Sequence, residues 1–325
     1  MIYPITRRTF VQTLSAAAVL TPPSPSYAEN DTVIRIGTPG NDAAGLVYYA
    51  NDAGFFKKYG LNVDVQTLVK GSGAANVAAV AGRSLEIAEA DLDAIAAARA
   101  HGINLAILAP SGWYNAAAPT TLLVVAEDSS ARSAKDLEGK TVAVPSLEGP
   151  SRVAGAAWLD QNGVSPDRVK FVEAPPPEMP AQVAHHVIDA AIIPQPSLAR
   201  ALAENERVLA HCYDALGKQW LISGWFASAD WVTKNLPAAT KFVKAMRETA
   251  AWANNPANHP RTAEILLKYS KISPDLVAKM TRATYTTRLD PVTMRPLLDA
   301  AVKYRILAQP VVPKELISPI ALANL

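Results

Sequence analysis

The sequence is poor in the residues that disulfide, redox and metal chemistry require. Its 325 residues include one cysteine, Cys212, and five histidines. A single cysteine cannot form a disulfide within the chain, so we expect Cys212 to be a buried structural thiol. His185 and His186 are adjacent, and adjacent side chains on a helix point apart, which argues against a metal-binding pair. The sequence therefore predicts neither a bound metal nor a cofactor.

The sequence also lacks a large excess of charge of either sign. The chain has 31 Lys and Arg residues against 29 Asp and Glu residues. Loss of residues 1–28 would remove Arg7, Arg8 and no acidic residue, leaving 29 charges of each sign. A neutral chain has no electrostatic reason to bind nucleic acid or an anionic membrane surface. No G-x-S-x-G, Walker or G-x-G-x-x-G motif follows an expected strand, so the common catalytic and nucleotide-binding loops are missing as well.

The N-terminal segment lacks a hydrophobic run long enough to span a bilayer, which needs about 20 residues. Its apolar stretch covers residues 14–20, after the pair Arg7 and Arg8 and before small residues at 25–28. Paired arginines, a short apolar stretch and small residues, in that order, are typical of a twin-arginine signal peptide. We therefore expect residues 1–28 to direct export and to be removed, which leaves a soluble periplasmic protein.

Short apolar segments alternate with alanine-rich helical segments along the rest of the chain. Strands are expected at residues 33–37, 61–69, 85–88, 105–109, 121–126, 141–144, 169–172, 188–193 and 221–227. Helices are expected at residues 43–56, 74–81, 91–100, 151–161, 178–186, 197–203, 238–253, 261–269, 274–281 and 291–304. This alternation predicts an α/β fold of mostly parallel sheets with helices on both faces.

After residue 229 the alternation gives way to helices alone, which predicts a two-lobed organisation. These C-terminal helices are too apolar to be disordered, so we expect them to pack back on the first lobe. Lobe 1 would comprise residues 29–118 and 229–325, and lobe 2 residues 119–228. Two crossings between the lobes would lie near residues 118–119 and 226–229.

Four polar or glycine-bearing loops follow expected strands, and ligands bind at the carboxyl ends of strands in open parallel sheets. The candidate ligand-binding residues in these loops are Thr38, Pro39, Gly40, Asn41, Asp42, Gly71, Ser72, Gly73, Ala90, Asp91, Ser146, Glu148, Gly149, Ser151 and Arg152. Helix starts offer free N–H groups and a positive dipole end, which favour an anionic group at residues 71–73 and 149–151. The same residue types also occur as plain caps and turns, and Asp42 and Asp91 fit N-caps well.

Aromatic and acidic residues supply further candidates. Trp113 and Tyr114 follow a strand end in a polar loop and could cover an apolar part of a ligand. Trp225 lies near the second expected crossing, and all three aromatic residues are also common in cores. Glu89, Asp91 and Asp93 form a carboxylate series, but no histidine or further carboxylate stands at metal-ligand spacing from it.

Four segments carry a family resemblance. They are residues 53–63 (AGFFKKYGLNV), 71–73 (GSG) with 80–88 (VAGRSLEIA), 136–145 (DLEGKTVAVP) and 188–196 (IDAAIIPQP). In combination they resemble the nitrate/sulfonate/taurine and thiamine-precursor branch of the periplasmic solute-binding proteins of ABC transporters. Two features depart from that pattern. Gln195 stands in a Pro-Gln-Pro turn where many relatives have an aromatic-acidic-proline turn, and the short strand ends in Ala88, Glu89 and Ala90, without the usual glycine.

The resemblance implies the type II two-lobed periplasmic binding protein fold, with two hinge crossings and a ligand clamped between the lobes. The resemblance also implies that residues 38–42, 71–73, 90–91 and 146–151 face the ligand. Its last segment adds Asp189 and Gln195 as candidate ligand contacts.

The function implied by the resemblance is that of a monomeric binding protein, not an enzyme. It would capture a small anionic or zwitterionic organic solute, such as a sulfonate, carboxylate or pyrimidine, for a membrane permease and its ATPase. Thiamine-pyrimidine synthases share this fold, but one cysteine and five scattered histidines do not supply their cysteine-rich segment and metal-binding histidines. A ligand-sensing module for a receptor is the other alternative that the sequence leaves open.

Overall fold

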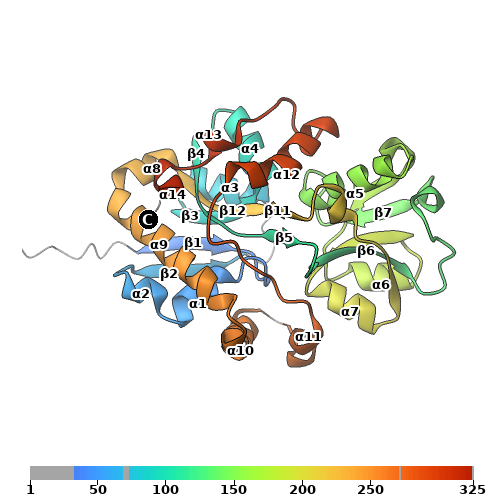
Figure 1. The fold of residues 1–325 in the computed structure, drawn as a ribbon, viewed down its shortest axis with the longest axis horizontal. Helices are drawn as coiled ribbons and strands as arrows, with labels where there is room; N and C mark the ends of the chain where they lie inside the picture. The colour runs from blue at the N-terminus through green and yellow to red at the C-terminus, as the bar shows by residue number, and fades with distance from the viewer. Residues whose placement is uncertain (1–32, 69–72, 271, 324–325) are drawn as a thin grey trace, which may run out of the picture. The chain divides into compact units, whose positions relative to one another are not determined.

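Two five-stranded sheets organise the described part of the chain (Figure 1). The computed structural model describes residues 33–68, 73–270 and 272–323, so the predicted signal peptide, Gly71 and Ser72 lie outside it. The first sheet has the order β2 (Val63–Thr67), β1 (Ile34–Thr38), β3 (Ile87–Asp91), β12 (Ser223–Ser228) and β4 (Leu105–Pro110). The second has the order β10 (Glu206–Ala210), β6 (Thr121–Ala126), β9 (Ala190–Pro194), β7 (Thr141–Val144) and β8 (Lys170–Glu173).

In each sheet four strands run in one direction and one strand runs against them. β12 is antiparallel to β3 and β4, and β6 is antiparallel to β9 and β10. The pairs β1 with β2, β1 with β3, β7 with β8 and β7 with β9 are parallel. The predicted α/β class with mostly parallel sheets is therefore confirmed. All six residues of β6 are buried, as expected for a continuous apolar run covered on both faces of its sheet.

Helices surround both sheets. Those between the strands are α1 (Leu46–Asp52), α2 (Phe55–Lys58), α3 (Gly73–Ala81), α4 (Leu92–Ala100), α5 (Pro150–Gln161), α6 (Met179–Ala184) and α7 (Ser197–Ala203). The C-terminal ones are α8 (Ala229–Lys234), α9 (Leu236–Ala253), α10 (His259–Tyr269), α11 (Pro274–Lys279), α12 (Pro291–Lys303), α13 (Pro313–Leu316) and α14 (Pro319–Leu322). The prediction of one helix over residues 43–56 is wrong, because Gly54 adopts φ +82° and separates α1 from α2.

A short antiparallel pair, β5 (Trp113–Asn115) and β11 (Gln219–Leu221), lies on the two connections between the sheets (Figure 1). The first connection agrees with the crossing expected near residues 118–119. The second was expected at residues 226–229, and this is wrong: Phe226 lies inside β12, opposite Ala88 and Ile107, and is fully buried. The chain leaves the second sheet at β10 and reaches the first at β12, so residues 211–222 form the connection. The lobe boundaries themselves remain a prediction.

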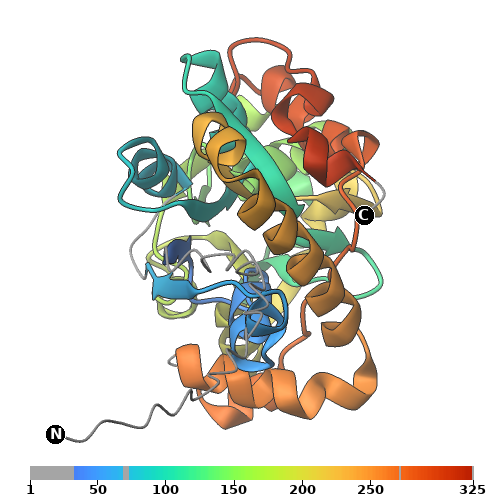
Figure 2. The ribbon, with the colours of Figure 1, turned by 90° about the vertical axis from the view of Figure 1, so that its left-hand side faces the viewer.

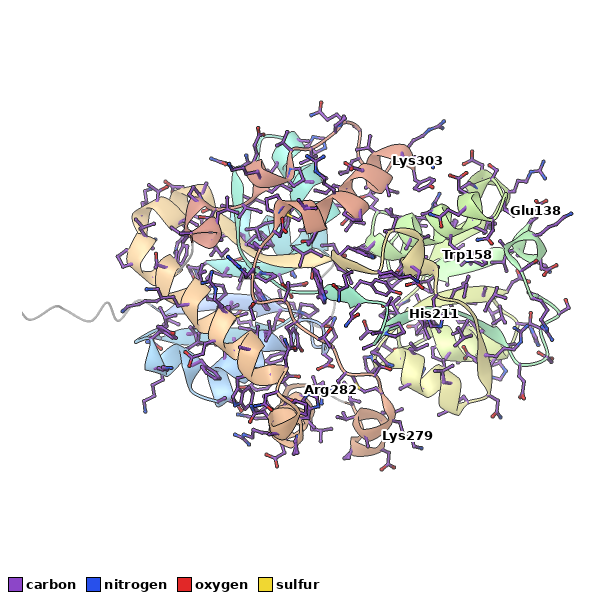
Figure 3. The ribbon with its side chains drawn as sticks, viewed as in Figure 1. Glu138, Trp158, His211, Lys279, Arg282 and Lys303 are labelled. Carbon is purple, nitrogen blue, oxygen red and sulfur yellow. The ribbon has the colours of Figure 1, made fainter. Side chains whose placement is uncertain are left out.

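The C-terminal helices contact elements around both sheets, not only those around the first. α9 lies across the first sheet and packs on α1 and β4 (Figure 2). α12, in contrast, contacts α4, β11 and α5, and α11 contacts α7. Lys303 at the end of α12 (Figure 3) places its Nζ 2.6 Å from Oδ2 of Asp160 on α5. The expectation that these helices pack on the first lobe alone is therefore too narrow.

Candidate ligand-binding site

Two acidic side chains end up side by side at the carboxyl end of β3. Successive residues of a strand point to opposite faces, so Glu89 and Asp91 share one face of the first sheet. β12 runs directly beside them, with Trp225 opposite Glu89 and Ser223 opposite Asp91. Asp93 follows two residues later in the first turn of α4 and is 1% exposed. Three carboxyl groups therefore lie close together where β3 passes into α4.

Burial and mutual repulsion act on these carboxyl groups in the same direction. Burial raises the pKa of Glu89, and the charge of Asp91 raises it further, while the hydroxyls of Ser223 and Ser111 partly oppose the increase. Burial also raises the pKa of Asp91. For Asp93, burial raises the pKa most, and the charge of Asp91 adds to it. A carboxylate is poorly solvated in this environment, so the site favours either a proton or a positive charge next to it.

Several buried polar atoms around the carboxyl groups have no hydrogen-bond partner among the described residues. They are Oδ2 of Asp93, Oδ1 of Asn76 and Nε1 of Trp225. The amide of Asn76 donates to the Glu89 carbonyl at 2.7 Å, and the Ser223 hydroxyl accepts from the Gly112 N–H at 2.7 Å. Buried polar groups are nearly always paired, so three unpaired atoms around one cluster of carboxyl groups indicate a place where a bound molecule could supply the missing hydrogen bonds.

Gly73 brings the start of α3 onto the turn between β3 and α4. A Cβ at this position would lie 3.1 Å from Cβ of Ala94 and 3.7 Å from the Asp91 nitrogen. The first turn of α3 therefore lies directly against the acidic region. A larger residue at this glycine would push the two elements apart.

The second sheet contributes a hydroxyl pair. Oγ of Ser151, near the start of α5, lies 2.9 Å from the hydroxyl of Tyr213 in the connection between β10 and β11. Burial raises the pKa of Tyr213, and the charge of Asp91 contributes to the increase. Glu148, in the loop before α5, likewise contributes to the raised pKa of Asp93. Asp91 and Asp93 therefore lie close enough to polar groups around the second sheet to interact with them electrostatically.

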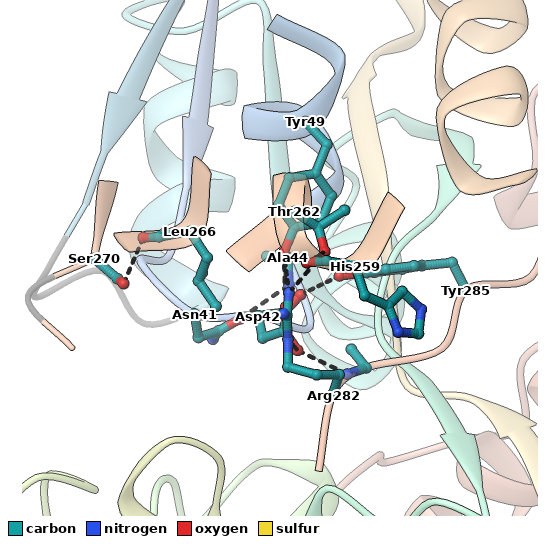
Figure 4. Close-up of polar contacts among 11 residues, drawn as sticks. Asn41, Asp42, Ala44, Tyr49, His259, Thr262, Leu266, Ser270, Arg282 and Tyr285 are labelled. Carbon is teal, nitrogen blue, oxygen red and sulfur yellow. Dashed lines mark hydrogen bonds and ion pairs between the residues drawn. The ribbon is translucent and has the colours of Figure 1, made fainter. Parts of the chain in front are cut away.

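The loop after β1 is held by a buried ion pair (Figure 4). The carboxylate of Asp42 accepts from Nε and Nη2 of Arg282, each at 3.0 Å, from the Tyr49 hydroxyl at 2.7 Å and from the Ala283 N–H at 2.7 Å. Asp42 therefore has a structural role, and these bonds argue against a ligand contact. The prediction that Asp42 is an N-cap is wrong, because the N-cap of α1 is Gly45.

The other residues of this loop are also held by local contacts. The side chain of Asn41 accepts from the Ala44 N–H at 2.9 Å, and the buried hydroxyl of Thr38 lies 3.3 Å from the Ala44 carbonyl. Pro39 and Gly40 are half-buried, and a Cβ at Gly40 would approach Cγ2 of Thr67 to 3.1 Å. The loop is a rigid support at the carboxyl end of β1.

Three residues that were predicted to contact the ligand make contacts with other parts of the chain. Arg152 stacks its guanidinium 4.1 Å from the centre of the Phe171 ring, facing β8. Asp189 accepts from the Thr141 N–H at 2.8 Å, at the end of β7 and β9 opposite their carboxyl ends. Gln195 accepts from the Ala199 N–H at 3.1 Å and so caps α7. These contacts argue against ligand-binding roles for Asp189 and Gln195, whereas Nη1 of Arg152 is buried and has no hydrogen-bond partner among the described residues.

The aromatic candidates lie mainly in the core. Tyr114 is 1% exposed, packs with Tyr213 and Trp220, and donates to Oδ1 of Asp214 at 2.8 Å. Trp225 is fully buried in the first sheet, and Trp113 is half-buried. Tyr114 therefore stabilises the connection between the sheets instead of covering a ligand.

The loop before α5 keeps the cap geometry expected for it. Gly149 is the N-cap and Pro150 the first helical residue, while the Ser146 hydroxyl accepts from the Glu148 N–H at 3.2 Å.

Ala90 is buried on the face of β3 opposite Glu89. Asp91 occupies the N-cap position of α4, but its side chain makes no capping bond, which leaves the carboxyl group available.

Four residues of the site, Asn76, Ser111, Tyr213 and Ser223, were missed in the sequence. Ser111 precedes a glycine just after β4, which is a signal for a loop at the carboxyl end of a strand. No local sequence pattern identifies Ser223 as a site residue, because its position beside Asp91 depends on the insertion of β12 between β3 and β4.

Comparison with known proteins gives a consistent family and fold. A model described as the NMT1-like family matches residues 27–267. The nitrate/nitrite binding protein NrtA of Synechococcus elongatus is 30% identical over 122 residues, which make up 36% of this chain but only 27% of that relative.

Two solved structures share the fold at low identity. The ligand binding component of an ABC-type import system from Staphylococcus aureus has a TM-score of 0.75 at 13% identity, covering 89% of this chain and 97% of that one. The periplasmic aliphatic sulphonate binding protein SsuA of Escherichia coli has a TM-score of 0.73 at 18% identity, covering 90% and 94%. The predicted periplasmic binding protein fold and family resemblance are confirmed.

Every helix in the described residues is too short or too polar to cross a bilayer.

Proposed function

Because the chain belongs to the NMT1-like family, we propose that it is the solute-binding component of an ABC importer. It captures a small organic solute in the periplasm and delivers it to a membrane permease that works with an ATPase. The signal peptide at residues 1–28 and its twin-arginine route are part of this proposal. The relatives named above are binding proteins, not enzymes, by their descriptions.

One observation carries the proposal. Polar groups around both sheets lie within electrostatic range of one another: the charge of Asp91, at the end of β3, contributes to the raised pKa of Tyr213, whose hydroxyl lies 2.9 Å from Oγ of Ser151. A solute held there contacts elements around both sheets. Such a ligand favours the closed arrangement through the contacts that it makes only in that state.

The ligand is a small zwitterionic or otherwise nitrogen-bearing organic solute instead of a plain anion. The predicted anion seat at the start of α5 is weak, since the Ser151 hydroxyl pairs with Tyr213 and Arg152 stacks on Phe171. The carboxyl groups of Glu89, Asp91 and Asp93 oppose an anion on the other side. The enzyme alternative has little support, because the relatives named above are described as binding proteins.

Calorimetry with the mature chain tests the proposal. The panel comprises sulfonates, carboxylates, aminopyrimidines and nitrate, and Tyr213→Phe is compared with Tyr304→Phe, whose hydroxyl donates to the exposed Asp160. We expect one class to bind, and Tyr213→Phe to weaken it by about 0.5–1.5 kcal/mol, roughly two- to twelvefold, because one hydrogen bond is lost. Tyr304→Phe should bind like the parent. If nothing binds, or if both variants bind like the parent, the site has been placed wrongly.

A further inference from the structure

The acidic region at the end of β3 has no ion-pair partner in the part of the chain that the structure describes. No ion pair between described residues involves Glu89, Asp91 or Asp93, although pairs are common elsewhere. Glu148, in the loop before α5, adds negative charge near Asp93. Arg152, the cation expected nearby, faces Phe171 instead. Carboxyl groups buried in this way are destabilising unless something pairs with them.

The unpartnered atoms around these carboxyl groups include two acceptors and one donor. Oδ2 of an ionised Asp93 and Oδ1 of Asn76 can only accept, and Nε1 of Trp225 can only donate. The residues that carry these atoms are 2% exposed or less. The atoms are independent of the charge argument, since two of the three belong to uncharged side chains. A group with several N–H donors would satisfy both acceptors, whereas nitrate or a sulfonate has no donors to offer them.

We infer that the protein recognises its solute through a cationic nitrogen group, an ammonium or amidinium, held by Glu89, Asp91 and Asp93. This inference rests on the proposed function and names the chemistry of the same site. An ammonium presents three N–H donors and an amidinium four, and either one replaces the missing counter-charge. The rest of the solute then extends toward Ser151 and Tyr213, where hydroxyls accept or donate.

The test uses pairs of probes that differ only in the charged nitrogen. They are 2-aminoethanesulfonate against 2-hydroxyethanesulfonate, benzamidine against benzamide, and nitrate alone, titrated into the mature chain by calorimetry. We expect the nitrogen cation of at least one pair to bind ten times more tightly than its neutral partner. Asp91→Asn should reduce that ratio to about one, while Asp299→Asn, at an exposed position on α12, should leave it unchanged. The Asp91 variant keeps the size of the side chain and removes a buried charge, so it is expected to fold.

Each other outcome has a defined meaning. If a hydroxyl or amide member binds as tightly as its cationic partner, or if nitrate binds more tightly than both, the inference is overturned while the importer function stands. Unchanged discrimination in Asp91→Asn also overturns it. If no probe binds but another solute of the broader panel does, and that solute has no cationic nitrogen, the inference again fails alone. If no solute of either set binds, the proposed function fails with it.

Discussion

The ion pair between Asp42 and Arg282 is the contact whose removal we expect to destabilise the protein most clearly. It joins the loop after β1 to the segment between α11 and α12, which are 240 residues apart in sequence. The side chain of Asp42 is 3% exposed and that of Arg282 is 19% exposed. The pKa of Arg282 is raised, because the Asp42 carboxylate outweighs the lowering effect of burial.

The substitution Arg282→Met removes the guanidinium and keeps the aliphatic stem. It leaves the buried Asp42 carboxylate with the Tyr49 hydroxyl and the Ala283 N–H as its remaining donors. Breaking a buried pair from one side costs about 3–5 kcal/mol, and the partial exposure of Arg282 places the loss near the lower end. We therefore expect the free energy of unfolding to fall by about 3 kcal/mol.

Urea unfolding followed by tryptophan fluorescence measures this loss. The matched control is Arg261→Met, which breaks a pair between side chains that are 52% and 65% exposed and should change stability by less than about 1 kcal/mol. Adding Asp42→Asn to Arg282→Met should recover part of the loss, because the uncompensated charge is then gone. An Arg282 variant as stable as the control, or a double variant with strictly additive losses, would show that the pair contributes nothing beyond its surroundings.

Two further predictions concern other parts of the chain. Glu206 is 5% exposed and lines a cavity of about 310 Å³, and burial followed by the charge of Glu204 raises its pKa to about 7. A carboxyl group whose pKa is higher in the folded than in the unfolded state lowers stability as the pH rises above its unfolded-state pKa, and the loss is complete above its folded-state pKa. Below the unfolded-state pKa the group has no effect on stability. Glu206→Gln should therefore gain about 1–2 kcal/mol at pH 8 and nothing at pH 4, whereas the exposed Glu127→Gln should gain nothing at either pH in the same melts. Replacing Arg7 and Arg8 by lysine should leave uncleaved precursor in the cytoplasmic fraction on immunoblots, and normal processing of that variant would assign the leader to another export route.

Local sequence patterns were sufficient for much of the fold. The expected ranges 121–126, 141–144 and 197–203 coincide with β6, β7 and α7, because each is a run of apolar or helix-forming residues bounded by turns. β10 (Glu206–Ala210) was missed, since a charged edge strand that pairs only with β6 has no clear apolar run of its own. Patterns of this kind also do not reveal that β12 pairs between β3 and β4.

The candidate site was harder to predict, because side-chain roles depend on tertiary partners. Asp42 and Asp91 look alike in sequence, each following a strand and preceding a helix. Asp42 pairs with Arg282, which is far away in the sequence, and no sequence pattern near Asp42 predicts that partner. The hydroxyl of Ser151 likewise pairs with Tyr213 across 62 residues. Residue type and position relative to a strand therefore pointed to the carboxyl edge of the first sheet, where the candidate site is proposed, but not to the side chains that remain available there.

Asp42 and the acidic residues at the end of β3 differ in whether the described residues provide a counter-charge. Asp42, Glu89 and Asp93 are buried at the carboxyl edge of the first sheet and Asp91 is half-buried there. An unpaired carboxylate in such a place lowers stability. The fold provides Asp42 with a guanidinium and two further donors, so it is able to neutralise a carboxylate at this edge. For Asp91 and Asp93 the described residues provide no cation, and repulsion between the two adds to the loss. Apolar or paired residues would make these positions more stable, and a positive charge that arrives with the ligand would supply the partner that the described residues lack.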